Sequence, residues 1–179
     1  VDVLVGRCSE CERADKHLRT FNMPMTPVTF PDGPWKKLGL DILGPINSLG
    51  SSKRFALVLV DYHSKWVYHK FLGEIVTGTV MAFLEEIFRI EGFPDTLVTD
   101  NGVQFKSEAM ERFLRSRGIK HYTTALYSPQ GNGLVERVNR VIKETVQLAK
   151  VAGTEVVKAV RDRLWSYHNT PHSTTGVSP

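Results

Sequence analysis

Four prolines lie within eleven positions near the start of this 179-residue chain and divide it into two unequal parts. They are Pro24, Pro27, Pro31 and Pro34. Each proline fixes its φ angle and lacks an amide donor, so neither a helix nor a central strand can run through this segment. We interpret residues 23–34 as an extended linker. Residues 1–22 are too few for a hydrophobic core, whereas residues 35–179 are numerous enough to form one compact domain.

Composition places the chain in a broad class. Hydrophobic residues make up 41% and charged residues 23% of it, as in ordinary globular proteins. The longest strongly apolar run, residues 55–60, is far shorter than the ~20 residues that span a bilayer and suits a buried strand. A net charge of +4 and a pI near 9.1 are compatible with a nucleic-acid partner but do not establish one.

Hydrophobic periodicity and turn residues predict strands and helices in mixed order. We expect strands at 38–43, 55–61, 65–72, 96–99 and 119–123. We expect helices at 77–91, 107–117, 134–152 and 154–169. Ser107 and Thr154 are the expected N-caps of the second and fourth helices, and the glycine-rich segment 127–133 is expected to be a loop. This order predicts an α/β fold in which helices flank a mixed sheet.

Three acidic residues occupy positions from which carboxylates can converge. Asp41 interrupts an apolar strand, Asp100 follows the short strand 96–99, and Glu136 lies in the first turn of the long helix. Strand centres, strand ends and helix starts hold side chains rigidly. Cutting or joining a phosphodiester requires charge neutralisation and an aligned hydroxyl, which two Mg²⁺ ions held by carboxylates supply. The three acids are therefore candidate metal ligands.

Each of these acids also has an ordinary structural interpretation. Asp41 would be a solvated residue on an edge strand, Asp100 would cap its turn, and Glu136 would complement the helix dipole. Position and residue type leave both interpretations open. We assign only turn roles to three further acids, Asp32, Asp61 and Asp95.

The helix 134–152 is amphipathic at 100° per residue. Its apolar side is expected to contain Leu134, Val135, Val138, Val141, Ile142, Thr145, Val146, Leu148 and Ala149. Its opposite side, centred on Glu136, is expected to contain Asn139, Arg140, Lys143, Gln147 and Lys150. Arginine and lysine contact phosphates, whereas asparagine and glutamine reach bases or sugars. This polar side is either a DNA-binding surface or an ordinary solvated helix face.

The residues that flank the three acids resemble those of retroviral-type integrases. Residues 99–105, Thr-Asp-Asn-Gly-Val-Gln-Phe, look like the segment around the second catalytic aspartate of that family. Residues 128–137 look like the loop and helix start that carry its glutamate, and thirty-five residues separate Asp100 from Glu136, as in the D,D-35-E class. Three further segments are similar to integrases of gypsy-type long-terminal-repeat retrotransposons: 35–45, 64–66 and 167–176.

The resemblance, which covers residues 35–179, implies an RNase H-like fold whose five-stranded mixed sheet has its first and fourth strands as central neighbours. It implies that Asp41, Asp100 and Glu136 are catalytic and hold two Mg²⁺ or Mn²⁺ ions. The implied reaction frees a 3′-hydroxyl at the end of the element and then joins it to target DNA. Five residues of the loop and the long helix are expected to contact DNA: Gln130, Asn132, Asn139, Arg140 and Lys143.

The N-terminal segment fits the same family. Cys8 and Cys11 resemble the last two ligands of its His₂Cys₂ zinc domain, and two thiolates alone cannot complete a tetrahedral zinc site. We expect residues 1–22 to be a remnant of that domain, which binds Zn²⁺ only in the full-length protein. Because the chain begins with valine and stops at Pro179, we interpret it as an internal fragment of a longer polyprotein product.

The role implied by the resemblance also predicts partners and a location. The expected partners are the ends of the retroelement DNA and the target DNA. The core is expected to form a homodimer, and a higher oligomer on DNA, without a membrane partner. The expected location is the nucleus, after assembly in a cytoplasmic virus-like particle.

Two other functions stay open. An RNase H-like hydrolytic nuclease needs a further glutamate on the first helix, where Glu85, Glu86 and Glu91 lie. A domesticated integrase-like module would keep the fold and bind DNA or a partner without catalysis. The flanking motifs argue against the nuclease, and the three retained acids argue against the module.

Overall fold

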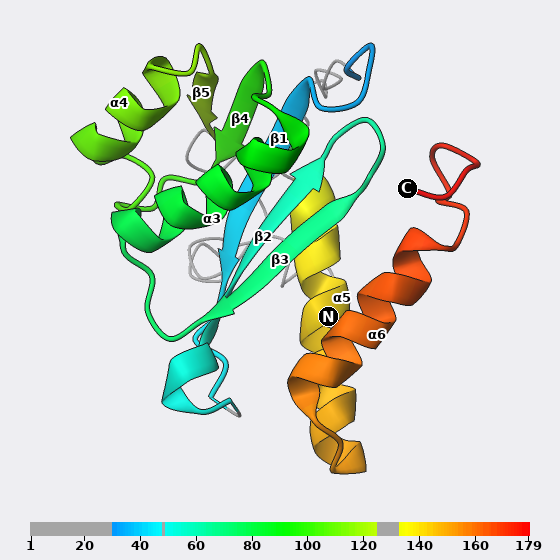
Figure 1. Ribbon diagram of the computed structural model, residues 1–179. Coiled ribbons are helices and arrows are strands. Elements are labelled where there is room, and N and C mark those ends of the chain that lie inside the picture. The colour runs from blue at the N-terminus through cyan, green and yellow to red at the C-terminus, as the bar shows by residue number, and fades with distance from the viewer. Residues whose placement is uncertain (1–29, 48, 125–132) are drawn as a thin grey trace, which may run out of the picture.

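A five-stranded mixed sheet forms the centre of the molecule, in the order β3-β2-β1-β4-β5 (Figure 1). The computed structural model describes residues 30–47, 49–124 and 133–179. The strands are β1 (Lys37–Leu43), β2 (Phe55–Asp61), β3 (Val67–Leu72), β4 (Thr96–Thr99) and β5 (Lys120–Thr123). Strand β1 pairs antiparallel with β2 and parallel with β4, which confirms the predicted neighbourhood of the first and fourth strands.

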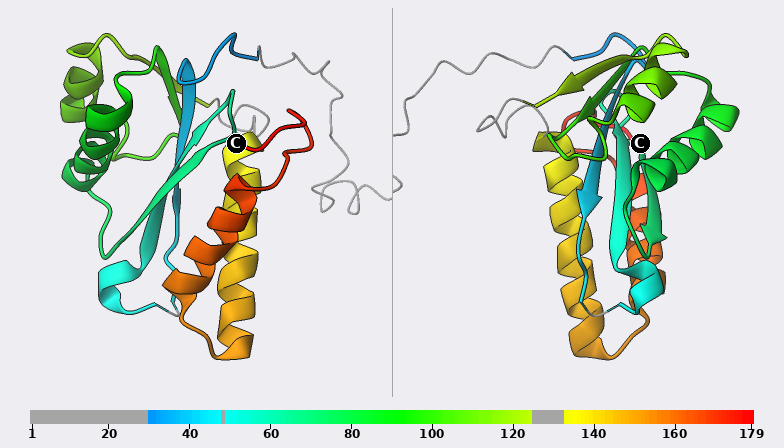
Figure 2. Two further views of the ribbon diagram at one scale, coloured as in Figure 1. Left: turned by 45° about the vertical axis from the view of Figure 1, so that its right-hand side comes forward. Right: turned by 90° about the vertical axis from the view of Figure 1, so that its left-hand side faces the viewer.

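Helices cover both faces of the sheet, so the molecule has three layers (Figure 2). The helices are α3 (Thr77–Glu91), α4 (Glu108–Arg115), α5 (Gly133–Ala152) and α6 (Val156–His168), with a short 3-10 helix η1 (Ser51–Lys53). The first two lie on one face and the last two on the other. In the part of the chain that the structure describes, no helix is long and apolar enough to cross a membrane.

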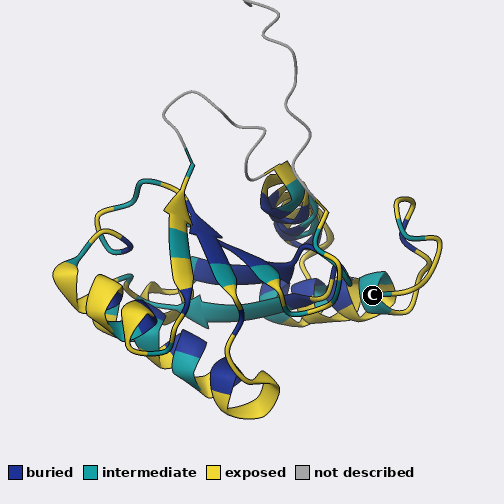
Figure 3. Cartoon of the chain, turned by 90° about the horizontal axis from the view of Figure 1, so that it is seen from above, coloured by how far each residue is buried: buried dark blue, intermediate teal, exposed yellow. Residues whose placement is uncertain are grey.

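The alternation of side chains along β2 explains why the sheet has two apolar faces. Leu57 and Leu59 point toward α3, whereas Val58 and Val60 point toward α5, and all four are fully buried. A strand covered on both faces reads as a continuous apolar run, as the sequence predicts for residues 55–60. Viewed from above, the buried strands lie between helices whose outer surfaces are exposed (Figure 3).

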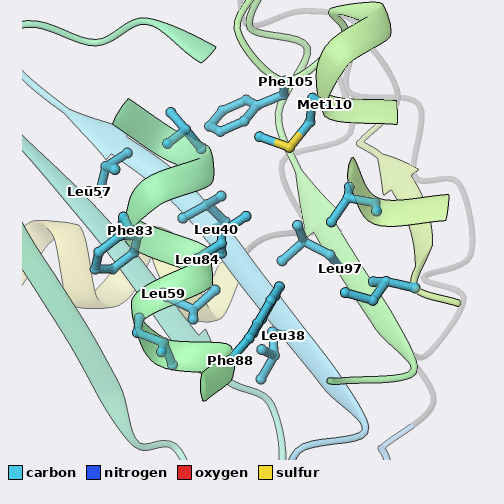
Figure 4. Close-up of a cluster of buried hydrophobic side chains, with 14 residues drawn as sticks. Leu38, Leu40, Leu57, Leu59, Phe83, Leu84, Phe88, Leu97, Phe105 and Met110 are labelled. Carbon is cyan, nitrogen blue, oxygen red and sulfur yellow. The ribbon is translucent and has the colours of Figure 1, made fainter. Parts of the chain in front are cut away.

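The α3 side of the sheet holds an apolar core. Phe83, Leu84 and Phe88 of α3 pack on the leucines of β1 and β2 (Figure 4). These helix positions recur at the spacing that places them on one side of α3. Burying each such side chain contributes roughly 1.5–3 kcal/mol to folding. This packing holds one face of the sheet in place, and Asp41 lies on the opposite face.

Several predicted element ends are confirmed. Gly92 ends α3 with a φ angle of 82°, a conformation that favours glycine. The Ser107 side chain accepts a hydrogen bond from the Met110 amide at 3.3 Å and so caps α4. Asp61 has the predicted turn role, because its carboxylate accepts bonds from the His63 and Ser64 amides.

Two predicted starts and one predicted orientation are wrong. The N-cap of α6 is Glu155 rather than Thr154, since its carboxylate accepts the Lys158 amide at 3.1 Å. Strand β3 begins at Val67, because Lys65 adopts a φ angle of 70° that belongs to a turn. Leu148, predicted on the apolar side of α5, is 69% exposed.

The last helix is fixed to the β2–β3 turn. The His168 ring stacks on Trp66 with centroids 3.8 Å apart, and its Nε2 accepts the Val67 amide at 3.1 Å. The Tyr167 hydroxyl donates to the Lys65 carbonyl oxygen at 3.1 Å. These contacts join residues about one hundred positions apart and hold α6, and with it α5, against the sheet.

Candidate active site

Asp41 lies on the central strand of the sheet and faces α5. Strand β1 is hydrogen-bonded to β2 on one side and to β4 on the other, so the ordinary interpretation of Asp41 as a residue of an edge strand does not hold. One Asp41 oxygen accepts the Ile42 amide at 2.8 Å and the other accepts Nδ2 of Asn139 at 2.8 Å. The side chain is half-buried. The β1–β2 ladder, in which Asp41 pairs with Val58, and two hydrogen bonds therefore fix this carboxylate.

Asp100 follows β4 at the edge of the same site. Leu40 pairs with Thr99 in the parallel ladder, so Asp41 and Asp100 are the next residues on two neighbouring strands. The Asp100 side chain is exposed, and its Oδ1 accepts the Gly102 amide at 2.9 Å. The carboxylate thus caps its own turn, as the ordinary interpretation predicts, and leaves its second oxygen available to a ligand.

Glu136 approaches from the first turn of α5. It is exposed, and it lines a cleft of about 480 Å³ together with Asp41, Asn139 and Lys143. The cleft continues along residues 42–47 and along Gln147 and Lys150 of the helix. Carboxylates therefore occupy one end of a groove whose helical wall is basic.

Asp100 and Glu136 act electrostatically on Asp41. Burial raises the pKa of Asp41 to about 6, and the negative charges of Asp100 and Glu136 add to the rise. The Ile42 amide and the Lys143 ammonium act in the opposite direction without cancelling it. A carboxyl group whose neighbours disfavour its charged form is stabilised by a cation that binds between them.

The donor set fits the predicted Mg²⁺ or Mn²⁺ in its chemistry. Carboxylate oxygens are the hard ligands that these ions prefer. Oδ1 of Asn139 is buried and has no hydrogen-bond partner among the described residues, so this acceptor beside Asp41 is unused. Within residues 30–47, 49–124 and 133–179, no three histidine, cysteine, aspartate or glutamate side chains are already close enough to share an ion.

Asn139 was predicted on the exposed polar side of α5, and this placement is wrong. The residue is only 6% exposed, and its amide is bonded to Asp41 across 98 positions of sequence. On a helical wheel Asn139 lies 60° from Glu136, at the border between the polar and apolar sides. At such a border, packing against the sheet determines whether a side chain is buried. The bond from Asn139 to Asp41 is not predicted from the sequence. The one available sign is an amide side chain three residues after Glu136.

The other predicted DNA-contacting residues fall into two groups. Arg140 and Lys143 are exposed on α5, and Lys143 lines the cleft. Gln130 and Asn132 lie outside the described residues, as do Cys8, Cys11 and most of the predicted linker. Their assignments stay predictions.

The glutamates that an RNase H-type site would use lie elsewhere. Helix α3 packs on the opposite face of the sheet from α5. Its Glu85 pairs with Arg117 at 2.7 Å, and the two other glutamates also have partners. These are Glu86 with Lys70, and Glu91 with the Tyr68 hydroxyl. Each carboxylate of α3 thus has a structural partner, and the helix does not line the cleft.

Comparisons with known proteins agree with the fold. A family model described as the integrase core domain matches residues 31–129. Over 97% of its length this chain is 35% identical to an uncharacterized protein of Caenorhabditis elegans, of which it spans 13%. Over 66% of its length it is 38% identical to the Pol polyprotein of Radiation murine leukemia virus, of which it spans 21%.

A solved structure is similar over almost the whole chain. A chain of the simian T-cell lymphotropic virus intasome in complex with PP2A regulatory subunit B56 gamma matches with a TM-score of 0.73. The match covers 96% of this chain and 61% of that one, at 21% identity, and so shows a common fold. The integrase core model spans more than half of the sequence and includes both aspartates. The chain belongs to the integrase core domain family.

Proposed function

We propose that this chain is the catalytic core of a retroelement integrase, which performs metal-dependent 3′-end processing and strand transfer into target DNA. One observation carries the proposal: Asp41 and Glu136 line the same cleft beside Lys143, and burial together with the charge of Glu136 raises the pKa of Asp41. Mutually repelling carboxylates attract divalent cations, and the adjacent ammonium attracts phosphate. The site thus combines binding of divalent cations with binding of phosphate, both of which phosphoryl transfer requires.

The residues have distinct roles in this reaction. Asp41, Asp100 and Glu136 would hold two Mg²⁺ or Mn²⁺ ions, which would neutralise charge on the phosphate and favour deprotonation of the attacking water or hydroxyl. Asn139 holds one oxygen of Asp41 and so orients the central carboxylate. Arg140 and Lys143, exposed on α5, would bind DNA phosphates and place the scissile bond over the acids.

We also propose the partners that such a role requires. The substrates are the ends of the element DNA and the target DNA, and the basic wall of the cleft supports this assignment. The core acts as a dimer within a larger assembly on DNA, and its place of action is the nucleus, where the target DNA lies.

The deciding experiment compares the chain with its Glu136→Gln variant on a branched DNA substrate that reports strand transfer in reverse. Joined product that requires Mg²⁺ or Mn²⁺ and disappears in Glu136→Gln is the expected result. Glu144→Gln is the matched control, because Glu144 is an exposed acid of the same helix outside the residues that line the cleft. This control is expected to keep the activity.

Two other outcomes would contradict the proposal. Retained DNA binding without product, equal in the wild type and both variants, would favour a binding module without catalysis. Metal-dependent cleavage without any joining would favour a hydrolytic nuclease. Fluorescence anisotropy with labelled DNA supplies the binding measurement for each protein.

A further inference from the structure

The residue before Asp100 connects it to a histidine on the edge strand. Thr99 is fully buried, and its hydroxyl donates to the carbonyl oxygen of Asp100 at 2.9 Å. Nε2 of His121, on β5, lies 2.9 Å from the same hydroxyl oxygen. The imidazole, the hydroxyl and the Asp100 carbonyl therefore form a continuous chain of hydrogen bonds.

The direction of this chain follows from proton counting. A hydroxyl has one proton, and here that proton goes to a carbonyl oxygen, which can only accept. Nε2 of His121 must then be the donor to the Thr99 oxygen. Burial lowers the pKa of His121, against the opposing effect of Glu111, and so favours the neutral ring.

Asp100 needs such a support more than Asp41 does. Asp41 lies within β1 and pairs with Val58 in the β1–β2 ladder, whereas β4 ends at Thr99, so Asp100 lies just beyond regular structure. The turn that contains Asp100 is held by a few individual bonds, among them Gly102 N to Asp100 Oδ1. A donor that fixes the Asp100 carbonyl restricts rotation of the peptide that carries the carboxylate.

The imidazole has no evident role as a filler of the core. His121 is only half-buried, and it lines an open cleft of about 460 Å³ with Glu111, Leu114 and Arg115. A leucine of similar size would fill the same space between α4 and β5. The distinctive property of histidine at this position is its hydrogen-bond donor.

We propose that His121 is a positioning residue, which acts through the Thr99 hydroxyl to fix the Asp100 peptide and thereby the carboxylate that binds the divalent ion. This inference rests on the proposed function, because it requires Asp100 to be a metal ligand. It assigns no contact between His121 and DNA or metal. The expected signature of its loss is weaker ion binding in a folded protein.

The test measures Mn²⁺ binding to the chain by electron paramagnetic resonance, without any assay of activity. His121→Leu removes the donor, and the dissociation constant for Mn²⁺ is expected to rise about threefold to tenfold, somewhat less than for loss of a direct partner of a ligand. His121→Gln keeps an N–H donor at similar reach and is expected to stay within about twofold of the wild type. His69→Leu, which removes a half-buried histidine of β3, is the matched control and is expected to bind as the wild type does.

A second pair of variants tests the path through the hydroxyl. Thr99→Val removes the hydroxyl at nearly constant volume, and adding His121→Leu to it is expected to cause no further loss of Mn²⁺ binding. Additive losses would show that the two residues act independently and would overturn the inference. Thermal melting of each variant shows whether the protein is folded, and the Thr99→Val and His121→Gln comparison decides the question if His121→Leu does not fold.

Failure of the inference and failure of the proposed function give different results. If the wild type binds no Mn²⁺, or if Asp100→Asn leaves binding unchanged, the metal role of the acids is wrong. If Asp100→Asn weakens binding while His121→Leu equals the wild type, only the role of His121 is overturned. Equal weakening in His121→Gln and His121→Leu would also overturn it, because the donor would then be irrelevant.

Discussion

The two faces of the sheet treat their carboxylates in opposite ways. On the α3 face, each of the three glutamates of the helix is bound by an arginine, a lysine or a tyrosine. On the α5 face, Asp41 is bound by a neutral amide, and burial together with the charges of two other acids raises its pKa to about 6. The first arrangement stabilises the fold, whereas the second leaves negative charge for a ligand to neutralise.

This difference indicates which acids are structural and which are functional. A glutamate with a partner loses a stabilising contact when it is replaced. An acid repelled by its neighbours loses a destabilising one, so its replacement should remove function without removing stability. Five measurements test this contrast, from the largest expected effect to the smallest.

Phe88→Ala should reduce the free energy of unfolding by about 3–5 kcal/mol, because it opens a cavity in the α3 layer. Chemical denaturation measures the loss. At low temperature, the folded fraction should retain its strand-transfer activity, since the cleft lies on the other face. A variant that is as stable as the wild type would show that this layer does not hold the sheet.

Asp41→Asn should reduce strand transfer by more than about a hundredfold, above the effect of removing an outer partner of a ligand. Its melting temperature should equal or exceed that of the wild type, because the repulsion from Asp100 and Glu136 disappears. Glu86→Gln on the α3 face is the control and should retain activity. A strong loss of stability in Asp41→Asn would make this acid structural instead.

Asn139→Leu should reduce strand transfer by about tenfold and raise the Mg²⁺ concentration needed for half-maximal rate. The substitution keeps the volume and removes the donor to Asp41, so the carboxylate loses its orientation. The rate measured over a Mg²⁺ titration separates this effect from loss of DNA binding. An unchanged Mg²⁺ requirement would exclude a role of Asn139 in ion binding.

Glu85→Gln should cost about 1 kcal/mol of stability or less, because the pair with Arg117 is partly exposed to solvent. Activity per folded molecule should be unchanged. Denaturation curves and the branched-substrate assay give the two values. Loss of activity without loss of stability would favour the RNase H-like nuclease, which needs a further glutamate on α3.

The smallest effect concerns pH. Burial, with the nearby charge of His69, lowers the pKa of His168 below 6.5, so the folded state favours the neutral ring that accepts the Val67 amide. Its contribution to stability is complete above pH 6.5 and is lost as the pH falls through the folded pKa. His168→Gln should therefore show a smaller decrease in stability between pH 7 and pH 5 than the wild type. The raised pKa of Asp41 affects both proteins equally. Parallel curves of stability against pH for the two proteins would contradict this role of His168.

Much of the fold could be predicted because its signals are local. The continuous run 55–60 predicts a strand buried on both faces, and Ser107 and Gly92 mark helix ends by their own chemistry. The central pairing of β1 with β4 came from the family resemblance, because no local signal specifies which strands are neighbours.

The side-chain partners of the site could not be predicted from the sequence. The bond between Asn139 and Asp41 depends on how α5 lies across the sheet, which is a property of the whole fold. The exposure of Leu148 has the same origin: Val146 and Ala149 of the same turns are buried, so the side of α5 that faces the rest of the fold decides which apolar residues are covered. The link from His121 to Thr99 likewise arises between two strands that pair only after folding.

The three acids are held to different degrees, and this difference has a thermodynamic consequence. Among the described residues the carboxylates are not gathered around one point. Asp41 lies within a paired strand, whereas Asp100 follows the end of β4 and Glu136 is exposed in the first turn of α5. Bringing the Asp100 and Glu136 carboxylates into place therefore costs free energy. The ligand that binds first meets this cost, so the second ligand binds more tightly. We expect DNA to increase the affinity for Mg²⁺, and Mg²⁺ to increase the affinity for DNA by the same factor, because coupling between two binding equilibria is reciprocal.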